Sequence, residues 1–258
     1  MRLLIQATLP LFLLGATIHA QADEHEQAQG QVQNVFTQVI NTNAGFFDVR
    51  EVHVERFDAS EFNIPDPIYR DYRNDCSDLG RGGDFSEDTD KVVQTGDINL
   101  EQIVNTAKET WNFIKNNQPV VNATTQYAQA LPRGSICWDD LENWQAPRSE
   151  YYKVTYNNGF GFEVVSLEFR LVYTYGGQVN NKGHFISNAT IQYSKINVKW
   201  SFDVNAGVEV PLVVNVGTKE DPVAGMQMSI RWSIRSLSHI EQTASFFIYG
   251  DGRPTEVL

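Results

Sequence analysis

The most constraining feature of the sequence is a long alternation of residue types between positions 196 and 216. Every even position from Ile196 to Val216 carries an apolar side chain, while the odd positions up to Glu209 are polar, charged or glycine. Such alternation is typical of a β-strand with one buried and one solvent-exposed face. An unbroken strand of this length would span roughly 70 Å. We therefore expect the strand to bend, either at a bulge at Gly207 or at a crossing between sheets near Pro211.

The same period-two pattern recurs through the rest of the C-terminal half. It covers residues 165–175, 185–193 and 226–234, and an apolar strand closes the series at 244–249. Glycine and asparagine at 176–183 predict a hairpin turn, and a shift of phase near Ser194 predicts a bulge or turn. These strands predict an antiparallel β-sandwich or open barrel over residues 119–258, in one domain with residues 23–118.

A helical period is the competing signal in the N-terminal half. Apolar residues from Leu100 to Ile114 recur at 3.6-residue spacing after the potential cap Asn99, which predicts an amphipathic helix over 100–118. A shorter helix is expected over 29–41 and a strand around residues 52–54. The expected fold class is therefore mainly β with some α (α+β), in which one long amphipathic helix covers the sheet.

The first 22 residues have the form of a secretory signal peptide. A basic residue, an apolar run and small residues follow one another, with cleavage expected after Ala20 or Ala22. Export predicts a periplasmic or extracellular protein, with the outer membrane as the alternative. In an oxidising compartment, Cys76 and Cys137 are expected to form a disulfide bond, and two inert buried thiols are the alternative.

Negative charge is concentrated in the N-terminal part of the protein. The chain has a formal net charge of −12, and the acidic side chains gather in the loop-rich segment 23–99. This field repels nucleic acid and anionic lipid headgroups, which excludes nucleic-acid binding. Residues 84–90, with Asp71, Asp75 and Asp78 nearby, offer oxygen ligands for calcium but lack EF-hand spacing. We interpret them as a solvated loop and expect no cofactor.

One segment has the composition of a ligand site. Two indoles flank three carboxylates, and aromatic faces beside fixed acceptors suit a small polar ligand such as a sugar. The candidate binding residues are Trp138, Asp139, Asp140, Glu142 and Trp144. The alternative is a turn whose tryptophans cap the core.

Catalytic motifs are absent from the sequence. It contains no Gly-x-Ser-x-Gly, His-Glu-x-x-His, Walker or Gly-x-Gly-x-x-Gly motif. We therefore expect an exported, non-enzymatic protein that binds a ligand or partner. One alternative is a pore-forming or outer-membrane-associated protein that inserts residues 196–234 into a bilayer. A second is a secreted hydrolase with His184 or His239 beside carboxylates in a cleft.

Trp200 is expected in the core, where its truncation to alanine would lower the free energy of unfolding by about 3–5 kcal/mol.

Overall fold

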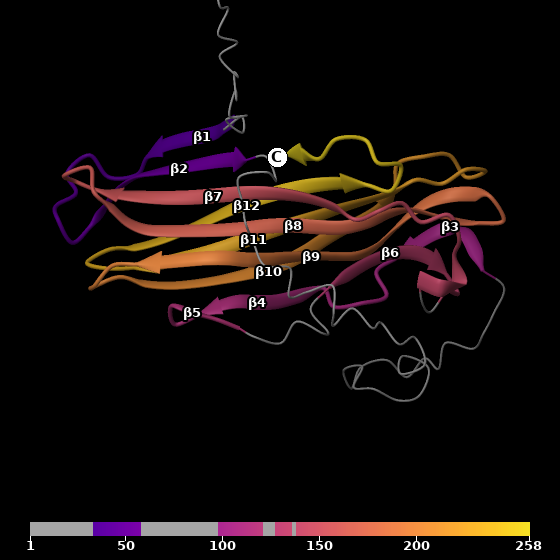
Figure 1. Cartoon of the computed structure of the whole chain (residues 1–258), viewed down its shortest axis with the longest axis horizontal. Helices are drawn as coiled ribbons and strands as arrows, with labels where there is room; N and C mark the ends of the chain where they lie inside the picture. Colours follow the sequence, from indigo (N-terminus) through magenta and orange to yellow (C-terminus); the bar gives the residue numbers. More distant parts are fainter. Residues whose placement is uncertain (1–32, 58–97, 121–126, 136–137) are drawn as a thin grey trace, which may run out of the picture.

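A computed structural model describes residues 33–57, 98–120, 127–135 and 138–258 of the chain. In these residues, two antiparallel sheets form an elongated molecule whose strands run along its long axis (Figure 1). The strands are β1 (Gln33–Val39), β2 (Val49–Phe57), β3 (Asn99–Val104), β4 (Thr110–Lys115), β5 (Gln118–Pro119), β6 (Ala128–Arg133), β7 (Arg148–Asn158), β8 (Glu163–Val179), β9 (Lys182–Val198), β10 (Asp203–Asn215), β11 (Ala224–Arg235), β12 (His239–Tyr249) and β13 (Glu256–Val257).

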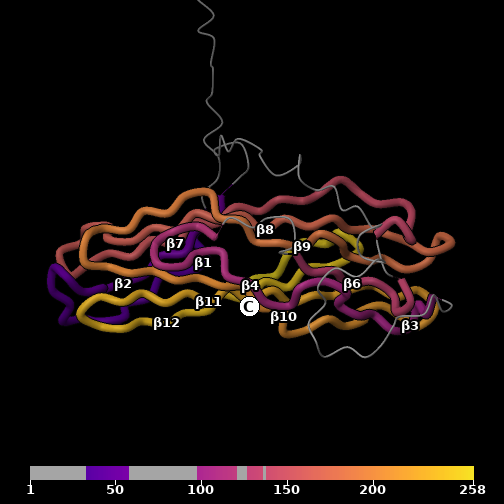
Figure 2. Tube along the Cα trace, turned by 90° about the horizontal axis from the view of Figure 1, so that it is seen from below, coloured from indigo at the N-terminus to yellow at the C-terminus, as the bar shows by residue number. Residues whose placement is uncertain are grey.

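The strand order places the long hairpins in separate sheets. The seven-stranded sheet has the order β1-β2-β7-β8-β9-β6-β3, and the six-stranded sheet has the order β13-β12-β11-β10-β4-β5. Figure 2 shows the same chain turned by 90°. The two sheets are consistent with the predicted sandwich, because side chains from both contribute to one buried apolar cluster.

Aromatic side chains join the two sheets inside this core. The ring of Tyr152 on β7 has its centroid 5.6 Å from that of Phe169 and 4.7 Å from that of Phe246 on β12. The indole Nε1 of Trp232 on β11 donates a hydrogen bond to the hydroxyl of Tyr156 on β7. Burial raises the pKa of Tyr156, because the phenolate would lose its hydration. These contacts pair the Trp232 indole N–H with the Tyr156 hydroxyl and pack large aromatic rings between the two sheets.

The alternating run at 196–216 crosses between the sheets earlier than predicted. Strand β9 belongs to the seven-stranded sheet and β10 to the six-stranded sheet, so the crossing is the turn at 199–202. In this turn the amide of Phe202 donates to the carbonyl of Lys199 over 3.2 Å, and Ser201 has φ 80°. Near Pro211 there is only a register shift between β10 and β11. Pro211 lies beyond the β4 pairing, where its missing N–H removes no ladder bond to that strand.

The predicted hairpin and bulge are confirmed. Asn180 and Asn181, with φ 50° and 59°, form a two-residue turn between the partners Val179 and Lys182. Positive φ at both turn residues matches the twist of the flanking strands. Farther along β9, Glu168 pairs with Lys195 and Phe169 with Tyr193, so Ser194 is the extra residue of a bulge.

The long helix predicted over 100–118 is wrong, and so is the α+β class built on it. Residues 99–104 form β3, which pairs with β6, and residues 110–115 form β4, which pairs with β10. No α-helix occurs in the described residues. Trp111 and Phe113 are both buried, which is the period of a strand. β-Branched and aromatic residues, which favour strands, are frequent in this segment. The neighbouring strands β6 and β10 supply partners for the ladder hydrogen bonds.

The short helix predicted over 29–41 is also corrected. Residues 33–39 form the edge strand β1, which pairs with β2, because Val35 and Phe36 pack against the sheet through a bulge rather than along a helical face. Three predictions concern residues outside the described ranges: the signal peptide at 1–22, the Cys76–Cys137 disulfide and the acidic loop at 84–90. No helix in the described part of the chain is long and apolar enough to cross a membrane.

Candidate functional site

The residues predicted to bind a ligand lie together on one segment beside the β8–β9 turn. Trp138 to Asp140 form a 3-10 helical turn, and the indole Nε1 of Trp144 donates to the Trp138 carbonyl over 2.9 Å. The Trp144 ring covers Gly177, where a Cβ atom would lie 2.4 Å from the ring. Trp144 therefore has a packing role, while Trp138 and Asp139 stay exposed.

The carboxylates of that segment have partners in the fold. Ser135 donates its hydroxyl to Asp140 over 3.2 Å, and a carboxylate oxygen of Glu142 accepts the amide of Asn181 over 3.2 Å. Glu142 also forms an isolated β-bridge with Gln178. The two indoles do not form one flat platform, because one of them covers Gly177. Ligand binding by this segment stays a prediction.

The two candidate histidines lie at opposite ends of the molecule. His184 lies near the start of β9 and forms a bridge to Val223. His239 begins β12, where its Nε2 atom lies 3.3 Å from a carboxylate oxygen of the exposed Glu241. No group of three or more metal-ligating side chains occurs in the described residues. This arrangement of the described residues therefore does not support the alternative of a secreted hydrolase.

The outer face of the six-stranded sheet carries a shallow polar groove of about 490 Å³. Side chains of β4, β10 and β11 line it, and an ion pair of 3.4 Å joins Glu209 to Arg231. Gly207 forms part of its floor, because a Cβ atom there would lie 3.1 Å from the Asn112 amide oxygen. The groove contains neither candidate histidine. It could hold a polar ligand, but it offers no exposed aromatic face.

The most distinctive surface is a cluster of aromatic side chains at the ends of the β1–β2, β7–β8 and β9–β10 connections, which lie at the left in Figure 1. We call it the aromatic end. Its members are Phe46 (52% exposed), Phe47 (39%), Phe160 (67%), Phe162 (62%) and Trp200 (83%). Sequence reasoning missed this surface, because it assigned Trp200 to the core. That assignment was wrong, since position 200 lies in the crossing turn rather than in a strand.

The rings of the aromatic end contact one another. The centroid of Phe46 lies 5.0 Å from Phe47, 6.1 Å from Phe160 and 6.5 Å from Phe162. Phe47 in turn lies 5.7 Å from Trp200. These separations are those of paired aromatic rings, so the cluster is a preassembled apolar surface.

Asn158 shapes the turn that presents two of the rings. Its side-chain oxygen accepts the amides of Phe160 and Phe162, each over 3.0 Å, and its side-chain nitrogen donates to the Phe46 carbonyl over 3.0 Å. Asn158 itself is fully buried. One buried side chain thus holds two separate connections in a fixed relation and turns their rings outward. Gly159 permits this approach, because a Cβ atom there would lie 1.6 Å from the Ala44 carbonyl oxygen.

Asp48 ties a fourth connection to the aromatic end. Its carboxylate accepts hydrogen bonds from the hydroxyls of Ser236 and Ser238 in the β11–β12 turn and, over 3.1 Å, from the side-chain amide of Asn41. Between the two serines lies Leu237, which is 81% exposed. Exposed apolar side chains therefore occur on connections of both sheets. The Asp48 carboxylate joins the β1–β2 and β11–β12 connections by accepting hydrogen bonds from neutral donors.

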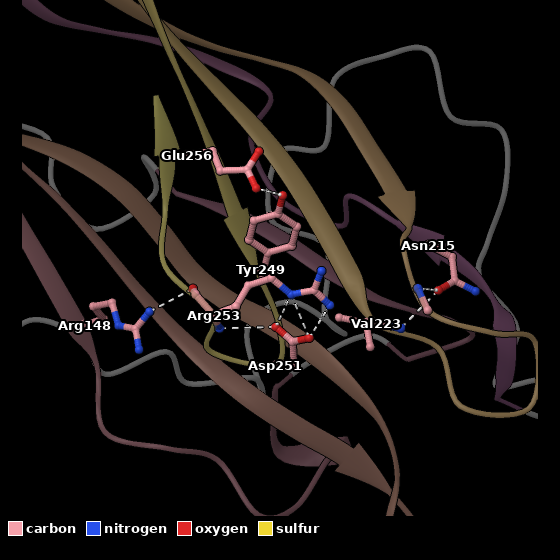
Figure 3. A network of polar contacts seen from close by, with 8 residues as sticks. Arg148, Asn215, Val223, Tyr249, Asp251, Arg253 and Glu256 are labelled. Carbon is pink, nitrogen blue, oxygen red and sulfur yellow. Dashed lines mark hydrogen bonds and ion pairs between the residues drawn. The ribbon is translucent and has the colours of Figure 1, made fainter. Parts of the chain in front are cut away.

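Toward the opposite end of the molecule, a network of polar contacts includes Arg148, Tyr249, Asp251, Arg253 and Glu256 (Figure 3). The Arg148 guanidinium donates to the Arg253 carbonyl over 3.0 Å, and the Arg253 side chain forms an ion pair with Asp251. The Tyr249 hydroxyl donates to Glu256 over 2.7 Å. These bonds hold the segment after β12 against the sandwich.

A buried carboxylate strengthens this attachment. Glu150 accepts the hydroxyls of Thr255 over 2.5 Å and Tyr152 over 3.0 Å, and its carboxylate lies 3.3 Å from the guanidinium of Arg56. Burial and the adjacent Glu150 raise the pKa of Tyr152, so its hydroxyl stays protonated as a donor. We call the end of the molecule that carries residues 138–143, 178–183, 216–223 and 250–256 the polar end.

No protein-family model, curated protein or solved structure matches the chain.

Proposed function

We propose that the protein is a non-enzymatic binding protein that docks on a lipid bilayer through its aromatic end. The observation that carries this proposal is the exposure of five aromatic side chains in mutual contact at one end of the molecule. Aromatic rings prefer the boundary between headgroups and acyl chains. Contiguous exposed apolar surface on a soluble domain marks an interaction site.

The shape of the cluster favours a bilayer as the partner. The rings project from chain connections and are 39–83% exposed, and they contact one another. A soft, flat surface can receive such rings without a matching pocket. Each ring that becomes fully buried contributes about 1.5–3 kcal/mol, so a few rings account for reversible attachment.

Docking by the connections differs from insertion of the strands. The apolar faces of β10 and β11 are buried in the core, including Val204, Val208 and Ile234. These faces are not available to lipid in this fold. The proposal therefore predicts membrane binding without release of vesicle contents, whereas the pore-forming alternative predicts release.

The first test measures binding of the protein to phosphatidylcholine vesicles by flotation. The variant with Phe160→Ser, Phe162→Ser and Trp200→Ser should bind at least about 1000 times more weakly, because three apolar contacts are lost. A matched control replaces three exposed apolar residues away from this end: Trp138→Ser, Leu212→Ser and Val216→Ser. Equal loss in both variants, or no binding by the unaltered protein, would refute the proposal.

A second test uses intrinsic fluorescence to report the orientation. Trp111 and Trp232 are buried and Trp200 is exposed, so vesicles should shift the emission to shorter wavelength mainly through Trp200. Trp200→Phe should abolish the shift while retaining vesicle binding. Trp138→Phe, a change at the polar end, should leave the shift in place. A shift that survives Trp200→Phe would contradict docking by the aromatic end.

A further inference from the structure

Three exposed basic residues flank the connections of the aromatic end and form no side-chain hydrogen bond or ion pair in the described residues. Arg50 follows the β1–β2 connection, Lys199 precedes Trp200, and Arg235 precedes the β11–β12 turn. Asp203 lies opposite Arg235 in the β10–β11 register, yet no ion pair joins the two side chains.

The acidic side chains at the same end are partnered. Asp48 accepts the hydroxyls of the β11–β12 turn. Glu163 accepts the Ser166 hydroxyl over 2.8 Å and the Asn197 amide over 3.3 Å. Asp203 accepts the side-chain amide of Asn117 over 3.3 Å. Asp48, Glu163 and Asp203 thus accept hydrogen bonds, whereas Arg50, Lys199 and Arg235 have no side-chain hydrogen bond in the described residues.

Basic side chains beside exposed aromatic rings suit the two layers of a phospholipid surface, the phosphates and the hydrocarbon boundary below them. When rings occupy the boundary of the hydrocarbon, long basic side chains on the same connections can extend back to the phosphates. An arginine guanidinium binds a phosphate through two parallel hydrogen bonds, and lysine binds it as a compact charge. A bilayer of uncharged glycolipid offers the same hydrocarbon but no anionic oxygen.

We propose that the aromatic end selects bilayers with phosphate-bearing headgroups, and that the phosphates bind Arg50, Lys199 and Arg235. This inference rests on the proposed docking function and specifies its lipid class. Because the three cations contact the phosphates directly, their attraction to the membrane surface acts despite the formal net charge of −12. Charges more than about 8 Å from the surface are largely screened at physiological salt.

The test compares vesicles of phosphatidylcholine with vesicles of digalactosyldiacylglycerol, which lacks phosphate. The protein should bind the phospholipid at least tenfold more tightly. The variant Arg50→Gln, Lys199→Gln, Arg235→Gln should lose that preference while keeping its glycolipid binding. A control with the same change of net charge away from this end, Lys108→Gln, Lys182→Gln, Lys219→Gln, should keep the preference.

The outcomes separate the two proposals. Equal binding of the unaltered protein to both lipids, with loss of binding in the aromatic variant, would overturn the phosphate assignment and leave docking intact. Equal loss of preference in both glutamine variants would also overturn the assignment, because only net charge would matter. Absence of binding to either lipid would refute docking itself. Circular dichroism of each variant verifies that the fold is retained.

Discussion

The two ends of the sandwich differ in the side chains that their connections present to solvent. At the polar end, Asn180 and Asn181 form a two-residue turn, and ion pairs and hydrogen bonds hold the neighbouring segments. At the aromatic end, the connections project Phe160, Phe162 and Trp200 into solvent. Both ends close hairpins of the same two sheets.

This difference teaches which side chains the fold needs. The polar end shows that asparagine is sufficient to close a connection in this sandwich. An exposed aromatic ring at a turn adds little to folding and lowers solubility. The internal supports of the aromatic end, Asn158 and Asp48, are polar and at least partly buried. The rings are therefore a surface placed on a scaffold rather than part of the scaffold.

The largest predicted effect separates two tryptophans. Trp232→Ala should lower the free energy of unfolding by about 3–5 kcal/mol, since a large buried ring leaves a cavity and only 1% of Trp232 is exposed. Trp200→Ala should change it by less than about 0.5 kcal/mol. Urea unfolding measures both. A large loss for Trp200→Ala would restore the core assignment and remove the distinction between rings and scaffold.

The next effect tests how closely the connections approach at the aromatic end. Gly159→Ala places a methyl group 1.6 Å from the Ala44 carbonyl oxygen, and backbone displacement should cost about 2–3 kcal/mol. Gly45→Ala is the matched control, because nothing lies within 4 Å of its added methyl group. Differential scanning calorimetry compares the two. Similar melting temperatures for both variants would show that the connections are not packed as described.

A smaller effect is expected at the carboxylate that joins the β11–β12 turn to the aromatic end. Asp48→Ala removes the acceptor of Ser236, Ser238 and Asn41 and should cost about 1–2 kcal/mol. Asp139→Ala at the polar end is the control, since Asp139 is exposed and has no side-chain partner in the described structure. If the two substitutions have equal effects on urea unfolding, the proposed support by Asp48 is wrong.

The smallest effect concerns the acid sensitivity of the polar end. Burial alone would raise the pKa of Asp251, but hydrogen bonds from the side chain and backbone of Arg253 outweigh it and lower the pKa below the ordinary value of 3.8. A lowered pKa stabilises the fold above the ordinary pKa, and this contribution is lost as the pH falls through the folded pKa.

Asp251→Asn should therefore reduce the unfolding free energy by about 0.2–1 kcal/mol near neutral pH. The difference from the unaltered protein should shrink as the pH falls below about 4. Equilibrium unfolding between pH 3 and 7 measures this difference. A difference that stays constant down to pH 3 would show that the carboxylate does not act through its charge.

The strands were predictable where alternation and burial agree. Between Val204 and Val210, every even residue is buried, so the period alone identifies β10. The segment 99–115 was not predictable in the same way, because its apolar residues follow a helical spacing and alternate only at Trp111 and Phe113. Its state was decided by pairing with β6 and β10, which no local pattern contains. Trp200 continued the alternation of its neighbours, and the crossing turn placed it outside the core.

The candidate site was less predictable than the strands for a physical reason. Trp138 and Trp144 are close in sequence, so a motif search finds them. Phe46, Phe160 and Trp200 become neighbours only when three connections meet. The sequence by itself determined the alternating strands of the C-terminal half, the existence of a hairpin turn within 176–183 and the charge, because these depend on local period and composition. The tertiary structure alone decided which turns share an end, because that depends on strand order and register between residues more than 100 positions apart.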